Sequence, residues 1–60
     1  MDTVSISEYA GALYRARGSK AEAEASEKFR QCEQQGKLDE ARDWNAIRRA
    51  IRAMRGPNES

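Results

Sequence analysis

Five basic side chains have the types and positions that could bind an anion. Arginine and lysine offer charge and hydrogen-bond donors to phosphate or carboxylate groups, and several together can hold a nucleic-acid backbone or an acidic protein surface. The fold expected below gathers five of them at one end of the molecule: Arg15, Arg17, Lys20, Arg52 and Arg55. These five residues are the candidate anion-binding site.

Catalytic and metal chemistry have little support in the sequence. Glu22, Glu24 and Glu27 are close together, but paired carboxylates need a cleft to do acid–base work, and a helical hairpin has no obvious one. Cys32 is the only cysteine, and the chain has no histidine to activate it or to complete a common zinc site. We therefore expect a non-enzymatic protein with no metal ion and no cofactor.

The composition restricts the class of protein further. Charged residues make up 35% of the 60 residues, yet the net charge is only +1, which is not typical of a dedicated nucleic-acid or membrane binder. No segment has the character of a signal peptide or approaches the ~20 apolar residues of a membrane span. Together with the lone cysteine, these features favour the cytoplasm.

Hydrophobic spacing predicts an all-α fold with helices at about 6–17, 20–35 and 38–55. Ser5 and Glu8 form a capping box that would start the first helix at residue 6. Gly36 suits a helix end, and the two-residue link that it makes with Lys37 predicts an antiparallel hairpin. Residues 1–55 are expected to form one small helical domain, with a disordered tail over 56–60.

Gly18 leaves two alternatives for the first helix. Ser19 and Glu22 form a second capping box, which favours a break and a three-helix mini-bundle. Against this, the apolar spacing continues from Tyr14 to Ala21 without a change of phase, and a helix tolerates one glycine at a cost of roughly 1 kcal/mol. A continuous helix would leave its apolar stripe exposed and would favour a dimeric helical bundle.

The last helix, roughly 27 Å long at 1.5 Å per residue, can cover only residues 18–35. The apolar stripe of the first helix therefore needs another contact, and it consists of Ile6, Tyr9, Leu13 and Tyr14. An apolar stripe without an intrachain contact marks a protein–protein interface. We therefore expect a small interaction module, either a homodimer or an accessory or regulatory subunit of a larger assembly. The alternative is a small nucleic-acid- or anion-binding protein.

Helix pairing predicts where the arginines of the last helix lie. In a hairpin centred on the link, Arg48 faces residue 25 and Arg55 faces residue 18. Arg52 faces residue 21 by the same arithmetic, so the nearby glutamates of the second helix tend to neutralise the bases around Arg48 and Arg52, whereas Arg55 belongs to the basic open end. Trp44 lies on the apolar stripe of the last helix, with Phe29 and Cys32 opposite, so all three are expected in the core.

Two short segments resemble known families. Residues 35–41, QGKLDEA, resemble the helix–turn–helix corner of a tetratricopeptide repeat, but the chain holds no second copy of the repeat. Residues 9–14, YAGALY, are similar to the start of the ATP synthase delta/OSCP subunit. Neither segment is long enough to imply a function.

Overall fold

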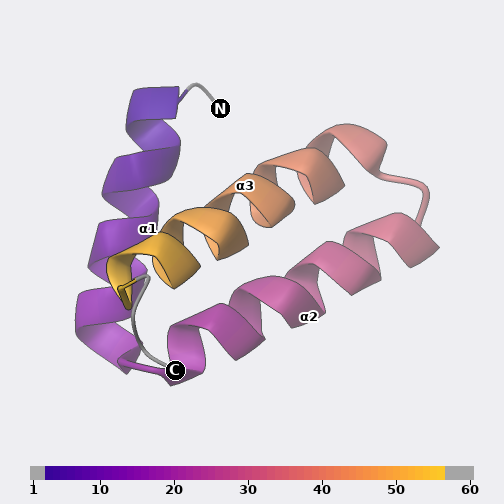
Figure 1. The fold of residues 1–60 in the computed structure, drawn as a ribbon. Helices are drawn as coiled ribbons and strands as arrows, with labels where there is room; N and C mark the ends of the chain where they lie inside the picture. The colour runs from indigo at the N-terminus through magenta and orange to yellow at the C-terminus, as the bar shows by residue number, and fades with distance from the viewer. Residues whose placement is uncertain (1–2, 57–60) are drawn as a thin grey trace.

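Three α-helices make up the chain over residues 3–56, the range that the computed structural model describes. Helix α1 spans Thr3–Arg17, α2 spans Lys20–Gln34 and α3 spans Leu38–Met54. α2 and α3 lie side by side as an antiparallel hairpin, and α1 lies across its open end (Figure 1). The predicted all-α fold is confirmed, and it takes the form of a three-helix bundle.

The turn between α2 and α3 is built on Gly36, as the sequence predicts. Its φ is +78°, in the left-handed region that only glycine adopts at little cost. Its N–H donates to the carbonyl oxygen of Glu33 at 3.1 Å, and the N–H of Lys37 donates to that of Cys32 at 2.8 Å. This pair of bonds is a Schellman motif, which satisfies carbonyl groups at the end of α2 and reverses the chain.

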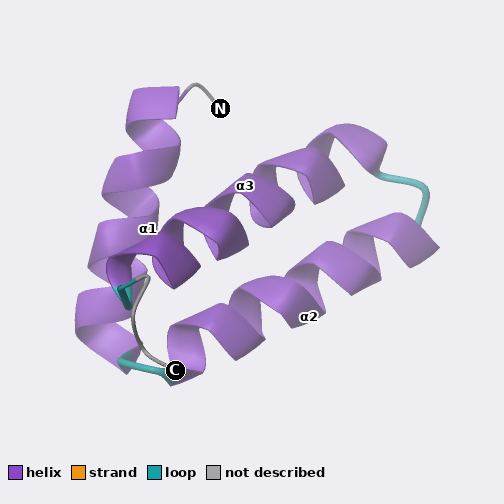
Figure 2. Ribbon diagram, viewed as in Figure 1, coloured by secondary structure: helices purple, strands orange, loops and turns teal. Residues whose placement is uncertain are grey.

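Gly18 ends α1, so the break that the capping signals favoured is confirmed. Its φ is +62°, and its N–H donates to the carbonyl oxygen of Tyr14 at 2.7 Å. Both glycine turns are short loops between the helices (Figure 2). The Ser19 side chain makes no capping hydrogen bond, because its backbone is helical (φ −65°, ψ −18°) and lacks the non-helical conformation of a capping residue. The carboxylate of Glu22 binds Arg55.

The structure moves one predicted helix boundary. The first helix begins at Thr3 and not at residue 6, so Ser5 lies inside the first turns of α1 and does not start it. No glycine or proline stands between residues 2 and 5 to stop the helix, and serine is tolerated in helices. The disordered tail expected over 56–60 lies outside the described residues, apart from Gly56.

The core is built mainly from alanine. Its fully buried members come from all three helices: Ala10, Ala21, Ala25, Ile47 and Ile51. Among the side chains that the structure describes, only the two isoleucines are large and have no exposed surface. Small side chains on α1 and α2 let the helix backbones approach closely, so little apolar bulk is needed to fill the space between them. Cys32 is buried as predicted, whereas Trp44 and Phe29 are half-buried.

The contacts between α2 and α3 lie one helical turn from the predicted pairing. The guanidinium carbon of Arg48 lies 5.6 Å from the ring centroid of Phe29, and Arg55 binds Glu22. Phe29 is four residues beyond position 25, which was predicted to face Arg48, and Glu22 is four residues beyond position 18, which was predicted to face Arg55. Helical side chains lean toward their own N-terminus, and in α3 that direction is toward the turn, so the long arginines reach partners nearer the turn.

Two glycine substitutions are expected to change stability in opposite directions. Gly36→Ala should lower the free energy of unfolding by about 1–2 kcal/mol, because a Cβ is disfavoured at a left-handed φ. Gly11→Ala should raise it by about 0.5–1 kcal/mol, because alanine loses less entropy inside a helix. A Cβ at Gly11 would lie 3.5 Å from Nη1 of Arg15 and 3.8 Å from Cε of Met54, which are ordinary contacts. Urea titrations followed by circular dichroism measure both changes. Unchanged stability of Gly36→Ala would contradict the left-handed turn, and a loss of stability in Gly11→Ala would contradict the space described beside α1.

Candidate functional site

The five predicted cations lie at the open end of the hairpin. The end of α1, the start of α2 and the end of α3 meet there (Figure 1). All five side chains are exposed: Arg15, Arg17, Lys20, Arg52 and Arg55. Nε of Arg17 lies 3.2 Å from Oε2 of Glu24, and Nη1 of Arg55 contacts Oε1 of Glu22. Two of the five positive charges are therefore paired within the chain, which weakens this end as an anion-binding site.

Arg48 has a structural role on the edge of the core. Its Nη2 donates to Oδ1 of Asn45 at 2.6 Å, and its guanidinium group lies over the face of Phe29, where the ring attracts a cation. Its Nε is buried and has no hydrogen-bond partner among the described residues. Burial on the aromatic ring and the bond to Asn45 hold this side chain at the edge of the core.

The apolar stripe of α1 divides into two parts. Ile6, Leu13 and Tyr14 pack against the buried cluster and are partly buried. Tyr9 is 44% exposed, and its ring meets the ring of Trp44 edge to face, with centroids 5.7 Å apart and an interplanar angle of 85°. Most of the predicted partner-binding stripe is thus in contact with α3 or α2, and Tyr9 remains the accessible aromatic residue.

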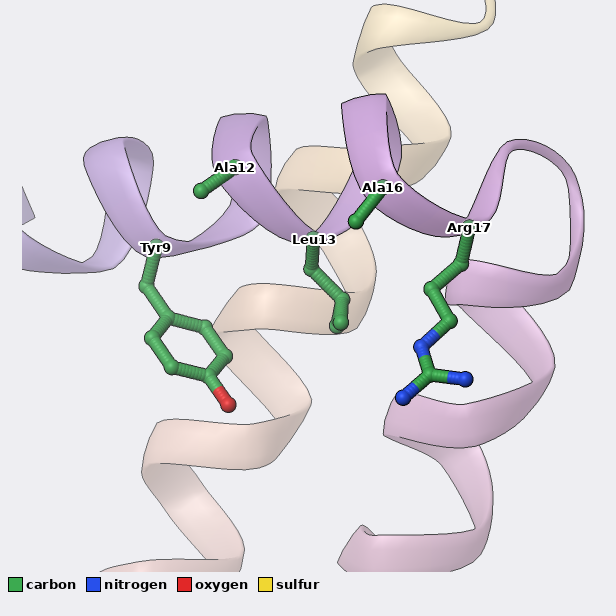
Figure 3. Close-up of a pocket in the computed structure, with 5 residues that line it drawn as sticks. All are labelled: Tyr9, Ala12, Leu13, Ala16 and Arg17. Atoms are coloured by element: carbon green, nitrogen blue, oxygen red, sulfur yellow. The ribbon is translucent and has the colours of Figure 1, made fainter.

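An open pocket of about 260 Å³ lies on α1, lined by Tyr9, Ala12, Leu13, Ala16 and Arg17. Tyr9, Leu13 and Arg17 project from the same side of α1, with Leu13 between the other two (Figure 3). Pockets for small molecules usually enclose about 300–1,000 Å³. This pocket is smaller than that and open to solvent, so it suits a side chain of another protein better than an enclosed ligand.

Ala12 and Ala16 were not among the predicted site residues. Both are exposed, and they stand four residues apart on a side of α1 that does not face the hairpin core. The sequence signal that could have identified them is the repeated small residue at one-turn spacing, which lets another helix approach closely. We call Tyr9, Ala12, Leu13 and Ala16 the α1 outer face.

Other features of the described residues do not form a second site. No group of histidine, cysteine or carboxylate side chains there could hold a metal ion. No helix in this range is long and apolar enough to cross a membrane. Leu38 is 67% exposed, but it lies at the turn of the hairpin, away from α1 (Figure 1). A single exposed apolar residue is common on protein surfaces.

Comparisons with protein-family models, curated proteins and solved structures found no match to this chain. The two short resemblances in its sequence therefore have no support from a family match.

Proposed function

We propose that this protein is a small, non-enzymatic protein–protein interaction module that docks through the α1 outer face. In this role it would be a homodimer or an accessory or regulatory subunit of a larger assembly. The observation that carries the proposal is the open apolar pocket on α1, which includes an accessible aromatic ring at Tyr9 and the small side chains of Ala12 and Ala16.

The chemistry of this face supports a helix as its partner. Tyrosine is one of the residues that most often anchor a protein interface, because it buries much apolar area at a low cost in conformational entropy. Ala12 and Ala16 leave room for a second helix to lie against α1. Edge-to-face contact with Trp44 holds the Tyr9 ring in place before a partner binds, which lowers the entropy cost of docking.

The alternative of anion binding receives less support from the geometry. Arg17 and Arg55 each contact a glutamate of α2, and the net charge of the chain is only +1. Salt dependence separates the two functions, because binding to a nucleic-acid backbone weakens steeply as salt is added. Docking on an apolar helix face depends on salt much less.

The reducing cytoplasm is the compartment that the proposal favours, because the chain has one unpaired thiol, at Cys32.

Photo-crosslinking tests the proposed docking face. A photoreactive phenylalanine analogue at position 9 is expected to form covalent adducts with a partner protein or a second copy of the chain, identified by mass spectrometry. The same analogue at position 23, an exposed alanine of α2, is the matched control and should give few adducts. Ala12→Glu, combined with the analogue at position 9, should reduce the adducts on the order of tenfold, because it places a charge in the apolar contact. Equal yields from positions 9 and 23, or adducts only within the chain, would contradict the proposal.

A further inference from the structure

We propose that the α1 outer face binds the same face of a second copy of this chain, with the two α1 helices antiparallel across a two-fold axis. This inference rests on the proposed function and names its partner. A two-fold interface uses one patch twice, so each residue must meet a suitable residue of the same patch in reverse order. The α1 outer face satisfies that condition in side-chain size, and its flank, formed by Glu8 and Arg15, satisfies it in charge.

The size match concerns Tyr9 and Ala12. In an antiparallel pair centred between residues 10 and 11, Tyr9 of each copy lies opposite Ala12 of the other copy. Each tyrosine ring then enters the open pocket beside Ala12, Leu13 and Ala16 of the second copy. Ala16 lies opposite Ser5 in this register, so small residues meet at both ends of the contact. At the centre of the contact a large side chain thus faces a small one, which is how closely packed helices interdigitate, and Leu13 lies opposite Glu8 at the edge of the face.

The charge match concerns Glu8 and Arg15. Both are exposed, and because they are seven residues apart they lie on the same flank of the α1 outer face. In an antiparallel two-fold pair each flank runs beside the same flank of the other copy. In the same register Glu8 of one copy lies opposite residue 13 of the other, roughly 3 Å along the helix from Arg15, so the two long side chains can pair, and symmetry makes this contact twice. Two reciprocal ion pairs set the register and favour a second copy over an unrelated helix.

The rest of the bundle leaves room for this contact. The buried side of α1 carries Ala10, which is about 160° around the helix from the exposed Ala12. The hairpins of the two copies therefore extend away from the contact. One helix per copy gives a small interface, at the low end of those seen in specific complexes. The dimer should accordingly be weak and should depend on protein concentration.

A charge swap tests the proposal on the full chain by sedimentation equilibrium at low salt. Glu8→Lys and Arg15→Glu should each raise the dimer dissociation constant about tenfold, because each change places like charges together at both symmetric contacts. The double variant should return to within about threefold of the original value, because it restores both ion pairs. Within one chain, Glu8 and Arg15 are about 10 Å apart along α1, so this rescue cannot arise from contact inside a monomer.

Controls separate the proposal from general effects of charge. Glu27→Lys changes the net charge by the same amount as Glu8→Lys, but at an exposed site on α2, and should leave the dissociation constant unchanged. Circular dichroism shows that each variant keeps its helices. A monomer at every concentration, or a double variant no tighter than the single ones, would overturn the proposal. If position 9 then still crosslinked to a different protein, the docking function would stand and only the second copy as partner would be excluded.

Discussion

Replacing Ile51 with alanine is expected to lower the free energy of unfolding by about 2–5 kcal/mol, enough to leave much of the chain unfolded. Ile51 has no exposed surface and is one of only two large side chains that are fully buried among the described residues. Its truncation removes apolar contacts and leaves a cavity that the surrounding alanines cannot fill. The free energy of unfolding of so small a domain is low, because a 60-residue chain buries only about 60% of its unfolded surface.

Urea denaturation followed by far-ultraviolet circular dichroism measures this loss. Met54→Ala, on the same helix, is the matched control, because Met54 is 41% exposed and loses much less buried area. We expect the control to cost clearly less than the Ile51 variant, which should show reduced helicity even without urea. Equal stability of the two variants would contradict the position of the core described here.

Replacing Ala25 with leucine is expected to destabilise the fold by about 1–3 kcal/mol through overpacking. Ala25 is fully buried and belongs to the core cluster with Ile47 and Ile51. Three additional carbon atoms at this position force α2 away from its neighbours or push side chains out of their preferred rotamers. Leucine is also a good helix former, so a loss of stability cannot come from helix propensity.

The same substitution at Ala23 provides the control. Ala23 lies two residues earlier on α2 and is exposed, so Ala23→Leu should change stability by less than about 0.5 kcal/mol. Thermal and urea unfolding of both variants give the comparison. If leucine were tolerated equally at positions 23 and 25, α2 would not present the face that the structure assigns to the core.

The hairpin of α2 and α3 could be predicted from sequence because its signals are local. Gly36 stands between two periodic segments, and the residues that follow it, Lys37 to Glu40, begin a helix with acids in its first turn. These features act within a few residues and do not depend on the rest of the fold. The observed helix ends lie within one residue of the predicted ones at both sides of the turn.

The sequence alone did not determine whether each Ser-x-x-Glu segment starts a helix. A serine followed three residues later by glutamate fits a helix start and also fits a helix interior, and Ser5 lies inside α1. At the second such segment, Gly18 decides the break through its left-handed φ, while Glu22 binds Arg55 from α3. A contact between residues far apart in the chain decided where this carboxylate points, and local sequence does not contain that information.

The candidate site was predicted only in part, for a similar reason. Apolar spacing singled out the stripe that includes Tyr9 and Leu13, because large apolar side chains dominate the periodic signal. Which edge of that stripe meets the hairpin depends on how α1 crosses α3 (Figure 1). The accessible edge includes Ala12 and Ala16, whose small size gives them little weight in a hydrophobic pattern although it suits them to close helix packing.

Isotope-filtered nuclear Overhauser spectroscopy tests most directly whether the α1 outer face joins two copies of the chain. In an equimolar mixture of labelled and unlabelled protein, the filter retains only contacts between different molecules. We expect contacts between the Tyr9 ring protons of one copy and the Ala12 methyl group of the other, while the Tyr9–Trp44 contact appears within each copy. Intermolecular contacts confined to other surfaces, such as the exposed Leu38 at the turn, or none at millimolar concentration, would contradict this account.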